Sequence, residues 1–395
     1  MTIASPSKTR GAIAVTALGI LALTGCAQTT PAAPGEAAAT PGSASAPASE
    51  TVTLTYDGGL VVLDAATLEV VGDVPIDGFT RVNPVGDGQN VLVTTETGFQ
   101  VLDTREPALT GLTFEGSKAG HAVPHAGKTV LFFDGTGDSV IFDTDALLAD
   151  NTTLPETTTV ASDAAHHGVS IELSDGTFVT TLSDRTGIVA TDANGNELAR
   201  STDCPGVHGE GTVKDEVVIV GCENGALAYA NGEITKLSSP DDFGRIGNMF
   251  TTEESAIALG DYKSDPDAEG YLLQAFSLVD TAAGTISVHD LPEGVGYTFR
   301  DLGRGSDNEA IILGSDGSLH LFAEADGSLI TSIPVIDAWE GPAEWQDAHP
   351  ALKVQDGIAY VTDPATSTIH AVDLKTEEIT TSETLPGVPN EIALS

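Results

Sequence analysis

The sequence has few basic residues: 16 Lys and Arg stand against 58 Asp and Glu, which gives a formal net charge of −42. Such a surface repels polyphosphate, so the composition excludes nucleic acid as a partner. It also excludes attachment to an anionic membrane through basic residues. The acidity predicts a solvated surface that attracts cations diffusely, which is not by itself a cation site.

Amphipathic helical periodicity is missing, and only residues 145–151 could form a short helical turn. Short apolar runs bounded by Gly, Asp and Asn take its place. Hairpin signals recur between these runs, at Asn194-Gly195, Asn224-Gly225, Asn231-Gly232, Asp316-Gly317, Asp326-Gly327 and Asp356-Gly357. Because 41% of the residues are hydrophobic, the chain can bury a sizeable core, and the pattern predicts an all-β fold.

The predicted strands form a repeat of about 35 to 55 residues, in which each unit opens with a polar segment. The openings lie near Arg81, His121, His166, His208, Arg245, Arg300, His349 and Asn390. This period suits the four-stranded blade of a β-propeller. The last unit has room for one strand, whereas residues 51–75 hold three strands and no opening. We therefore expect the N- and C-terminal strands to pair and close a ring of eight blades, with seven blades as the alternative.

The chain has only three cysteines, and the first belongs to a targeting signal. Residues 23–26, Leu-Thr-Gly-Cys, follow a basic start and an apolar run, which resembles a bacterial lipobox. The run is too short for a comfortable membrane span. We interpret residues 1–26 as a lipoprotein signal peptide with lipidation at Cys26, residues 27–50 as a flexible Ala/Pro/Ser/Thr tether, and residues 51–395 as one domain. The protein is then extracytoplasmic and held at the cell membrane by its lipid anchor only.

The other two cysteines, Cys204 and Cys222, both flank strand-like sequence. Disulfides persist outside the cytoplasm, so a bond between them is the first expectation. A thiolate metal site is the alternative, which the wide spacing of the pair does not favour.

Histidines gather at the blade openings: five of the nine open three consecutive units, and a sixth opens another. Equivalent openings converge at one mouth of a propeller channel, so imidazoles from adjacent blades can meet at one cation. Neutral imidazole is a common ligand for zinc, copper and nickel. The candidate ligands are His121, His125, His166, His167, His208, His349 and Asp347. His349 lies across the channel and needs a long loop or a second site; the alternative for each histidine is an ordinary hydrogen-bonded loop residue.

Four segments around these histidines resemble the AztD-type zinc metallochaperones: residues 120–125, 165–169, 204–210 and 347–350. That family comprises secreted β-propellers that bind zinc and pass it to the solute-binding protein of a zinc-importing ABC transporter. The resemblance covers roughly residues 80–395. It implies zinc ligands among His121, His166, His167, His208 and His349, Asp347 as a partner, and a Cys204–Cys222 disulfide. One departure is that no histidine precedes His121, whereas family members can carry a His-rich segment near the mature N-terminus.

These observations predict a monomeric zinc chaperone rather than an enzyme. Neither a Gly-x-Ser-x-Gly elbow nor a P-loop occurs in the sequence. Two alternatives stay open. One is a propeller hydrolase or lactonase that depends on a divalent metal, although such sites favour carboxylate and Asn ligands for calcium. The other is a metal-free scaffold for protein interactions.

Overall fold

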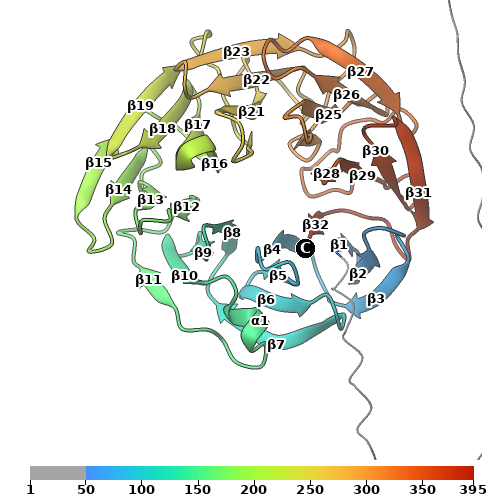
Figure 1. The fold of residues 1–395 in the computed structure, drawn as a ribbon, viewed down its shortest axis with the longest axis horizontal. Helices are drawn as coiled ribbons and strands as arrows, with labels where there is room; N and C mark the ends of the chain where they lie inside the picture. Colours follow the sequence, from blue (N-terminus) through green and yellow to red (C-terminus); the bar gives the residue numbers. More distant parts are fainter. Residues whose placement is uncertain (1–49) are drawn as a thin grey trace, which may run out of the picture. The chain divides into compact units, whose positions relative to one another are not determined.

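The computed structural model describes residues 50–395, which fold into eight four-stranded antiparallel sheets arranged in a ring (Figure 1). The predicted eight-bladed β-propeller is confirmed. The signal peptide, Cys26 and the tether predicted before residue 50 lie outside the described residues. Within the described range, no helix is long and apolar enough to cross a membrane.

Each blade runs from the channel to the rim of the ring. The innermost strands are β4 (Arg81–Pro84), β8 (Ala119–His125), β12 (Ser170–Glu172), β16 (His208–Val213), β20 (Met249–Phe250), β24 (Leu302–Arg304), β28 (Leu352–Gln355) and β32 (Ile392–Leu394). The second strands are β1 (Thr51–Tyr56), β5 (Asn90–Thr95), β9 (Lys128–Phe133), β13 (Phe178–Thr181), β17 (Val217–Cys222), β21 (Ile257–Tyr262), β25 (Ala310–Leu313) and β29 (Ile358–Asp363).

Two further strands complete each blade. The third strands are β2 (Gly59–Asp64), β6 (Gly98–Asp103), β10 (Asp138–Asp143), β14 (Ile188–Thr191), β18 (Gly225–Ala230), β22 (Ala275–Asp280), β26 (Ser318–Phe322) and β30 (Thr368–Asp373). The outer strands are β3 (Val70–Pro75), β7 (Ala108–Glu115), β11 (Thr158–Val160), β15 (Glu197–Ser201), β19 (Glu233–Ser238), β23 (Thr285–Asp290), β27 (Leu329–Pro334) and β31 (Glu378–Thr384). The predicted helical turn is α1 (Ala146–Ala149), and a 3-10 turn spans Lys214–Glu216.

The hydrophobic core lies between neighbouring blades. Leu92 and Phe99 of one blade, for example, pack with Leu131 and Phe133 of the next. The second and third strands are therefore buried on both faces, which explains why they read as continuous apolar runs instead of alternating ones. Outer strands such as β31 are largely exposed.

The ring is closed by its two ends, as the sequence predicts. Strand β32 pairs antiparallel with β1, in the register Val52↔Leu394 and Leu54↔Ile392. The backbone amides of Thr51 and Ser395 donate to each other's carbonyls over 2.8 and 3.0 Å. The blade built from both termini leaves neither end strand unpaired, which protects edges that would otherwise invite aggregation.

Two of the predicted hairpin turns show why the sequence signal works. Asn231 and Gly232 both have positive φ values, of 50° and 84°, and Asp356 and Gly357 have values of 49° and 78°. Type I′ turns require positive φ at both central residues, and Asn, Asp and Gly tolerate that conformation.

Candidate metal centre

Three consecutive blades bring three histidines together beside the channel. His121 lies in β8, His167 precedes β12, and His208 is the first residue of β16. The ring centroid of His121 lies 5.2 Å from that of His167 and 5.5 Å from that of His208, and those of His167 and His208 are 4.9 Å apart. One nitrogen from each ring lies within 4.8 Å of the other two, so the three residues can share one metal ion. We call them the three-histidine group.

The Nδ1 atom of every ring in the three-histidine group faces an acceptor. His121 Nδ1 lies 3.1 Å from Glu210 Oε1, and His167 Nδ1 lies 2.7 Å from Asp134 Oδ2. His208 Nδ1 contacts the backbone carbonyl of Gly247. Since carboxylates and carbonyls only accept hydrogen bonds here, each Nδ1 carries the proton and donates. In the neutral ring, Nε2 then carries the lone pair that a metal requires.

The separation of the rings fits a tetrahedral ion with modest adjustment. Zinc binds imidazole nitrogen at about 2.0–2.1 Å, which places tetrahedral ligand atoms about 3.3–3.4 Å apart. The nitrogens of the three-histidine group need to approach by no more than about 1.5 Å from their 4.8 Å limit. Side-chain rotation can supply such a shift, so the residues present fit a zinc site with three imidazole ligands and one open position.

Charge and burial shift the pKa values of His121, His208 and Glu210 in different directions. Burial, which lowers the pKa of His121, is outweighed by the charge of Glu210 and the hydrogen bond to it, so the pKa of His121 lies above its ordinary 6.5. Burial and the nearby His121 and His167 rings lower the pKa of His208 to about 3. Burial raises the pKa of Glu210, but His121 overcomes this effect and the net shift is downward. A proton therefore resides more readily on His121 than on His208, and a metal ion must displace it.

Bulges in two innermost strands aim the ligands. In β16 the register shifts between His208 and Glu210, and Gly209 between them has a φ of 66°. A Cβ at position 209 would lie 2.8 Å from the carbonyl oxygen of Gly247, so glycine is needed there on two counts. Strand β8 has a similar shift between Ala119 and Ala122, where His121 lies. Bulges change the direction of side chains at functional sites, and here they bring both Glu210 and His208 next to the imidazole ring of His121.

A disulfide bond joins Cys204 and Cys222, as predicted. Both residues are fully buried, and their Cα atoms are 4.8 Å apart. The bond ties the loop before His208 to the end of β17, the strand that pairs with His208 through Gly221. It therefore supports the backbone of one member of the three-histidine group.

Four of the sequence-predicted ligands lie elsewhere. His166 contacts the Ala164 carbonyl and Thr181 Oγ1, at 2.9 and 3.2 Å, and packs edge-on against Phe132. His125, at the other end of β8, contacts Glu216 at 2.9 Å.

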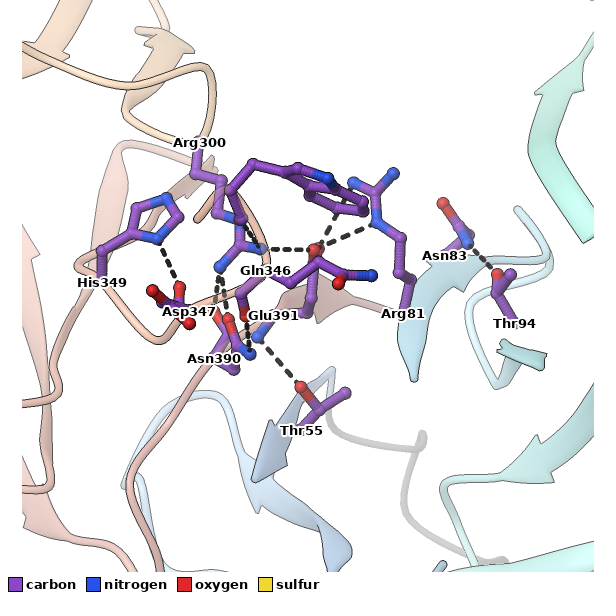
Figure 2. A network of polar contacts seen from close by, with 11 residues as sticks. Thr55, Arg81, Asn83, Thr94, Arg300, Gln346, Asp347, His349, Asn390 and Glu391 are labelled. Atoms are coloured by element: carbon purple, nitrogen blue, oxygen red, sulfur yellow. Dashed lines mark hydrogen bonds and ion pairs between the residues drawn. The ribbon is translucent and has the colours of Figure 1, made fainter. Parts of the chain in front are cut away.

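His349 lies near Arg300, and its Nδ1 donates to the Asp347 carbonyl over 2.7 Å (Figure 2). The Asp347 carboxylate accepts a hydrogen bond from the Glu344 amide. The structure does not bring these four residues to the three-histidine group.

Asp134 and the Gly247 carbonyl are contacts of the group that the sequence interpretation missed. Asp134 directly follows β9, one blade before His167 along the chain, at the turn into β10. A carboxylate after the second strand of a His-opened blade is a signal that could be sought. The Gly247 carbonyl left no signal, because any residue supplies a backbone oxygen.

The three-histidine group opens into a cavity of about 550 Å³ at the channel. Its wall also includes Arg81, Arg245, Lys263, Tyr271 and Trp345. A metal ion in the group can therefore be reached from this cavity.

The fold and this site define a class: an eight-bladed β-propeller that carries a partly buried three-histidine group in its channel. No family model matches the sequence. The curated zinc chaperone AztD of Citrobacter koseri is 26% identical to this chain over 300 residues, which cover 74% of this chain and 69% of that protein. The chain is thus a homologue of AztD, and the resemblance seen in the sequence is confirmed.

Solved structures show the same fold. Two structures of AztD from Citrobacter koseri, one of them described as apo, have TM-scores of 0.73 and 0.71 and 21% identity. Each comparison covers 88% of this chain and 97% of the solved one. The dihydro-heme d1 dehydrogenase NirN shares the fold more distantly, with a TM-score of 0.61, 12% identity, and coverage of 87% of this chain and 74% of that one.

Proposed function

We propose that this protein is a zinc chaperone that carries one zinc ion on His121, His167 and His208. The observation that carries the proposal is the fixed orientation of the three rings: each Nδ1 donates to Glu210, Asp134 or the Gly247 carbonyl. In each ring Nε2 is then the nitrogen left to bind a metal, and one nitrogen from each ring lies within 4.8 Å of the other two. Metal-bound histidines in proteins show this same outer hydrogen bond, which orients the ring and raises its basicity.

A three-histidine site suits cargo that must be handed on. Structural zinc sites are closed by four protein ligands, whereas three ligands leave a fourth position for water or an incoming donor. A ligand from an acceptor protein could enter that position before the histidines release the ion. The cavity beside the group supplies the approach. The homologous protein is a zinc chaperone, which supports zinc as the bound ion. It also supports a role for that ion as cargo and not as a catalyst.

The acceptor we propose is the solute-binding protein of a zinc-importing ABC transporter, which the family resemblance implies. The proposed location is extracytoplasmic, with a monomeric propeller anchored at the cell membrane through a lipid on Cys26. A tether of this kind confines the chaperone to the membrane that holds the transporter and raises their effective concentration. The buried Cys204–Cys222 disulfide agrees with an oxidising compartment.

A transfer assay tests this proposal. The chain from residue 27, loaded with one zinc ion, would be mixed with a metal-free solute-binding protein of a zinc importer from the same organism. We expect the acceptor to fill faster than zinc dissociates from the chaperone into excess chelator, because ligand exchange occurs within a complex. Filling only at the passive dissociation rate would contradict direct delivery. A solute-binding protein specific for another solute serves as the control.

A further inference from the structure

Cations gather in the channel of this strongly acidic protein. A cavity of about 150 Å³ is lined by Arg81 of β4, Arg300 from the loop before β24, and Lys353 of β28. Glu391, directly before β32, is the carboxylate of its wall, and Asn83 and Asn248 add amide groups. Three cations therefore share one anion in a chain that has only 16 basic residues.

The single carboxylate is already engaged by two of these cations (Figure 2). Glu391 Oε1 lies 3.0 Å from Arg81 Nε and 2.9 Å from Arg300 Nη2. Lys353 Nζ has no hydrogen bond or ion pair within residues 50–395. Burial lowers the pKa of Lys353, and the charge of Glu391 offsets this only in part, so the ammonium group lacks the counter-charge that would stabilise it. Arg300 Nε is buried and likewise lacks an acceptor among these residues. Two positive charges are thus left without a balancing carboxylate.

Neighbouring acids do not supply the missing charge. The Asp301 carboxyl accepts from the Thr298 amide and hydroxyl at 2.6 and 2.8 Å, and burial raises the pKa of Asp301 to about 8. Burial therefore opposes a negative charge on Asp301. Asp347 is not part of the cavity wall, and its carboxylate accepts a hydrogen bond from the Glu344 amide instead of contacting Arg300 or Lys353. Unbalanced charges in a partly desolvated channel are costly unless a counter-charge joins them.

We propose that this cavity, which we call the cationic pocket, binds a small doubly charged oxyanion such as phosphate or a short dicarboxylate. Arginine and lysine groups are the protein donors that hold such anions most strongly, through charge-assisted hydrogen bonds. Two unbalanced positive charges match an anion of charge −2. A volume of about 150 Å³ admits an ion of that size and excludes nucleotides or larger polyanions.

The cationic pocket adjoins the three-histidine group, so the two sites are coupled. Arg81, Asn83 and Asn248 line both the cationic pocket and the larger cavity of the histidines. Arg81 lies in the wall of both cavities, so its positive charge disfavours a further positive charge at the histidines. An anion beside Arg81 offsets that repulsion, and zinc would in turn favour the anion, because coupling between two binding sites is reciprocal. This second step rests on the proposed function.

Calorimetric titration of the metal-free chain from residue 27 with sodium sulfate, phosphate and succinate tests the pocket itself. We expect one anion per chain, and at least tenfold weaker binding to a Lys353→Met variant. The matched control is Lys375→Met, because Lys375 is exposed and is not part of the pocket wall. The anion affinity of this control variant should stay within twofold of wild type. Asn83→Asp provides a second variant: it places a carboxylate in the pocket and should also weaken anion binding at least tenfold.

Absence of saturable binding of all three anions, or unchanged affinity in both pocket variants, would overturn the proposal. The coupling is measured separately, from the zinc affinity of the wild type with and without saturating sulfate. Tighter zinc binding in sulfate, lost in Lys353→Met, is the expected result. Unchanged zinc affinity would remove the coupling. Anion binding by a chain that takes up no zinc would leave the pocket in place and refute the proposed function alone.

Discussion

Replacing Glu210 by glutamine separates the charge of this residue from its shape. The glutamine side chain keeps an oxygen that can accept from His121 Nδ1, which lies 3.1 Å from the carboxylate in the wild type, but it carries no charge. Loss of an outer partner of a metal-bound histidine typically costs about 10- to 100-fold in metal affinity. The Glu210 side chain is only 13% exposed, so water screens its charge little and we expect the upper half of that range. This corresponds to about 2–3 kcal/mol.

The same substitution has a second, independent signature in the pH profile. In the wild type, Glu210 holds the pKa of His121 above 6.5, so a proton competes with zinc at neutral pH. Below that pKa, zinc affinity should fall about tenfold per pH unit for one displaced proton, and above it the affinity should level off. Glu210→Gln lowers the pKa of His121, so the acid loss of zinc should move to lower pH even though the plateau affinity is weaker.

Competition titrations against a zinc chelator between about pH 5.5 and 8 would measure both effects, because this range brackets the ordinary pKa of histidine. Glu216→Gln is the matched control, because Glu216 also contacts a histidine, His125 at 2.9 Å, outside the three-histidine group. Its zinc affinity should stay within twofold of wild type. Equal losses in both variants, or a Glu210→Gln profile with the wild-type midpoint, would refute the reasoning.

Three further predictions address the same account. Asp134→Asn should weaken zinc binding by about 10-fold, the lower end of the usual range, because the Asp134 carboxylate is 24% exposed and so more accessible to water than that of Glu210. Competition with a chelator would measure the zinc affinity, and an unchanged affinity would contradict a role of Asp134 in orienting His167. Replacing Cys204 and Cys222 by alanine should lower the free energy of unfolding by about 3 kcal/mol for a closed loop of this length, measured in urea, and stability equal to wild type would contradict the prediction. Glu391→Gln should lower the free energy of unfolding by about 3–5 kcal/mol in the same measurement, because it leaves Arg81 and Arg300 without their shared anion. A loss below about 1 kcal/mol would contradict a stabilising role for these two ion pairs.

The fold was predictable because each blade repeats one pattern. Openings expected near Arg81, His121 and His208 lie within the innermost strands, and that expected near His349 lies just before one. Closure followed from counting: three strands at the start and one at the end complete a blade. Local patterning therefore fixes the number and order of strands, because every apolar run needs neighbours on both faces.

The choice among the histidines was less predictable, because it depends on short-range geometry. His121 and His125 are four residues apart in one strand, which separates them by about 13 Å at about 3.3 Å per residue. His166 and His167 are adjacent, and side chains of adjacent residues in extended backbone point to opposite sides. Which of each pair reaches the channel depends on bulges such as that at Gly209, whose position follows from packing against Gly247 in the next blade. Asp134 was missed for a related reason: its contact with His167 crosses between blades.

The most direct test of the account is the zinc stoichiometry of two triple variants. The first is His121→Ala/His167→Ala/His208→Ala, and the second is His125→Gln/His166→Gln/His349→Gln, which alters the other blade-opening histidines. Each would be compared with wild type by calorimetric titration and elemental analysis, after thermal melting has shown that it is folded. The account predicts one tightly bound zinc ion in the wild type and in the second variant, and none in the first. Retention of zinc by the first variant, or its loss from the second alone, would contradict it.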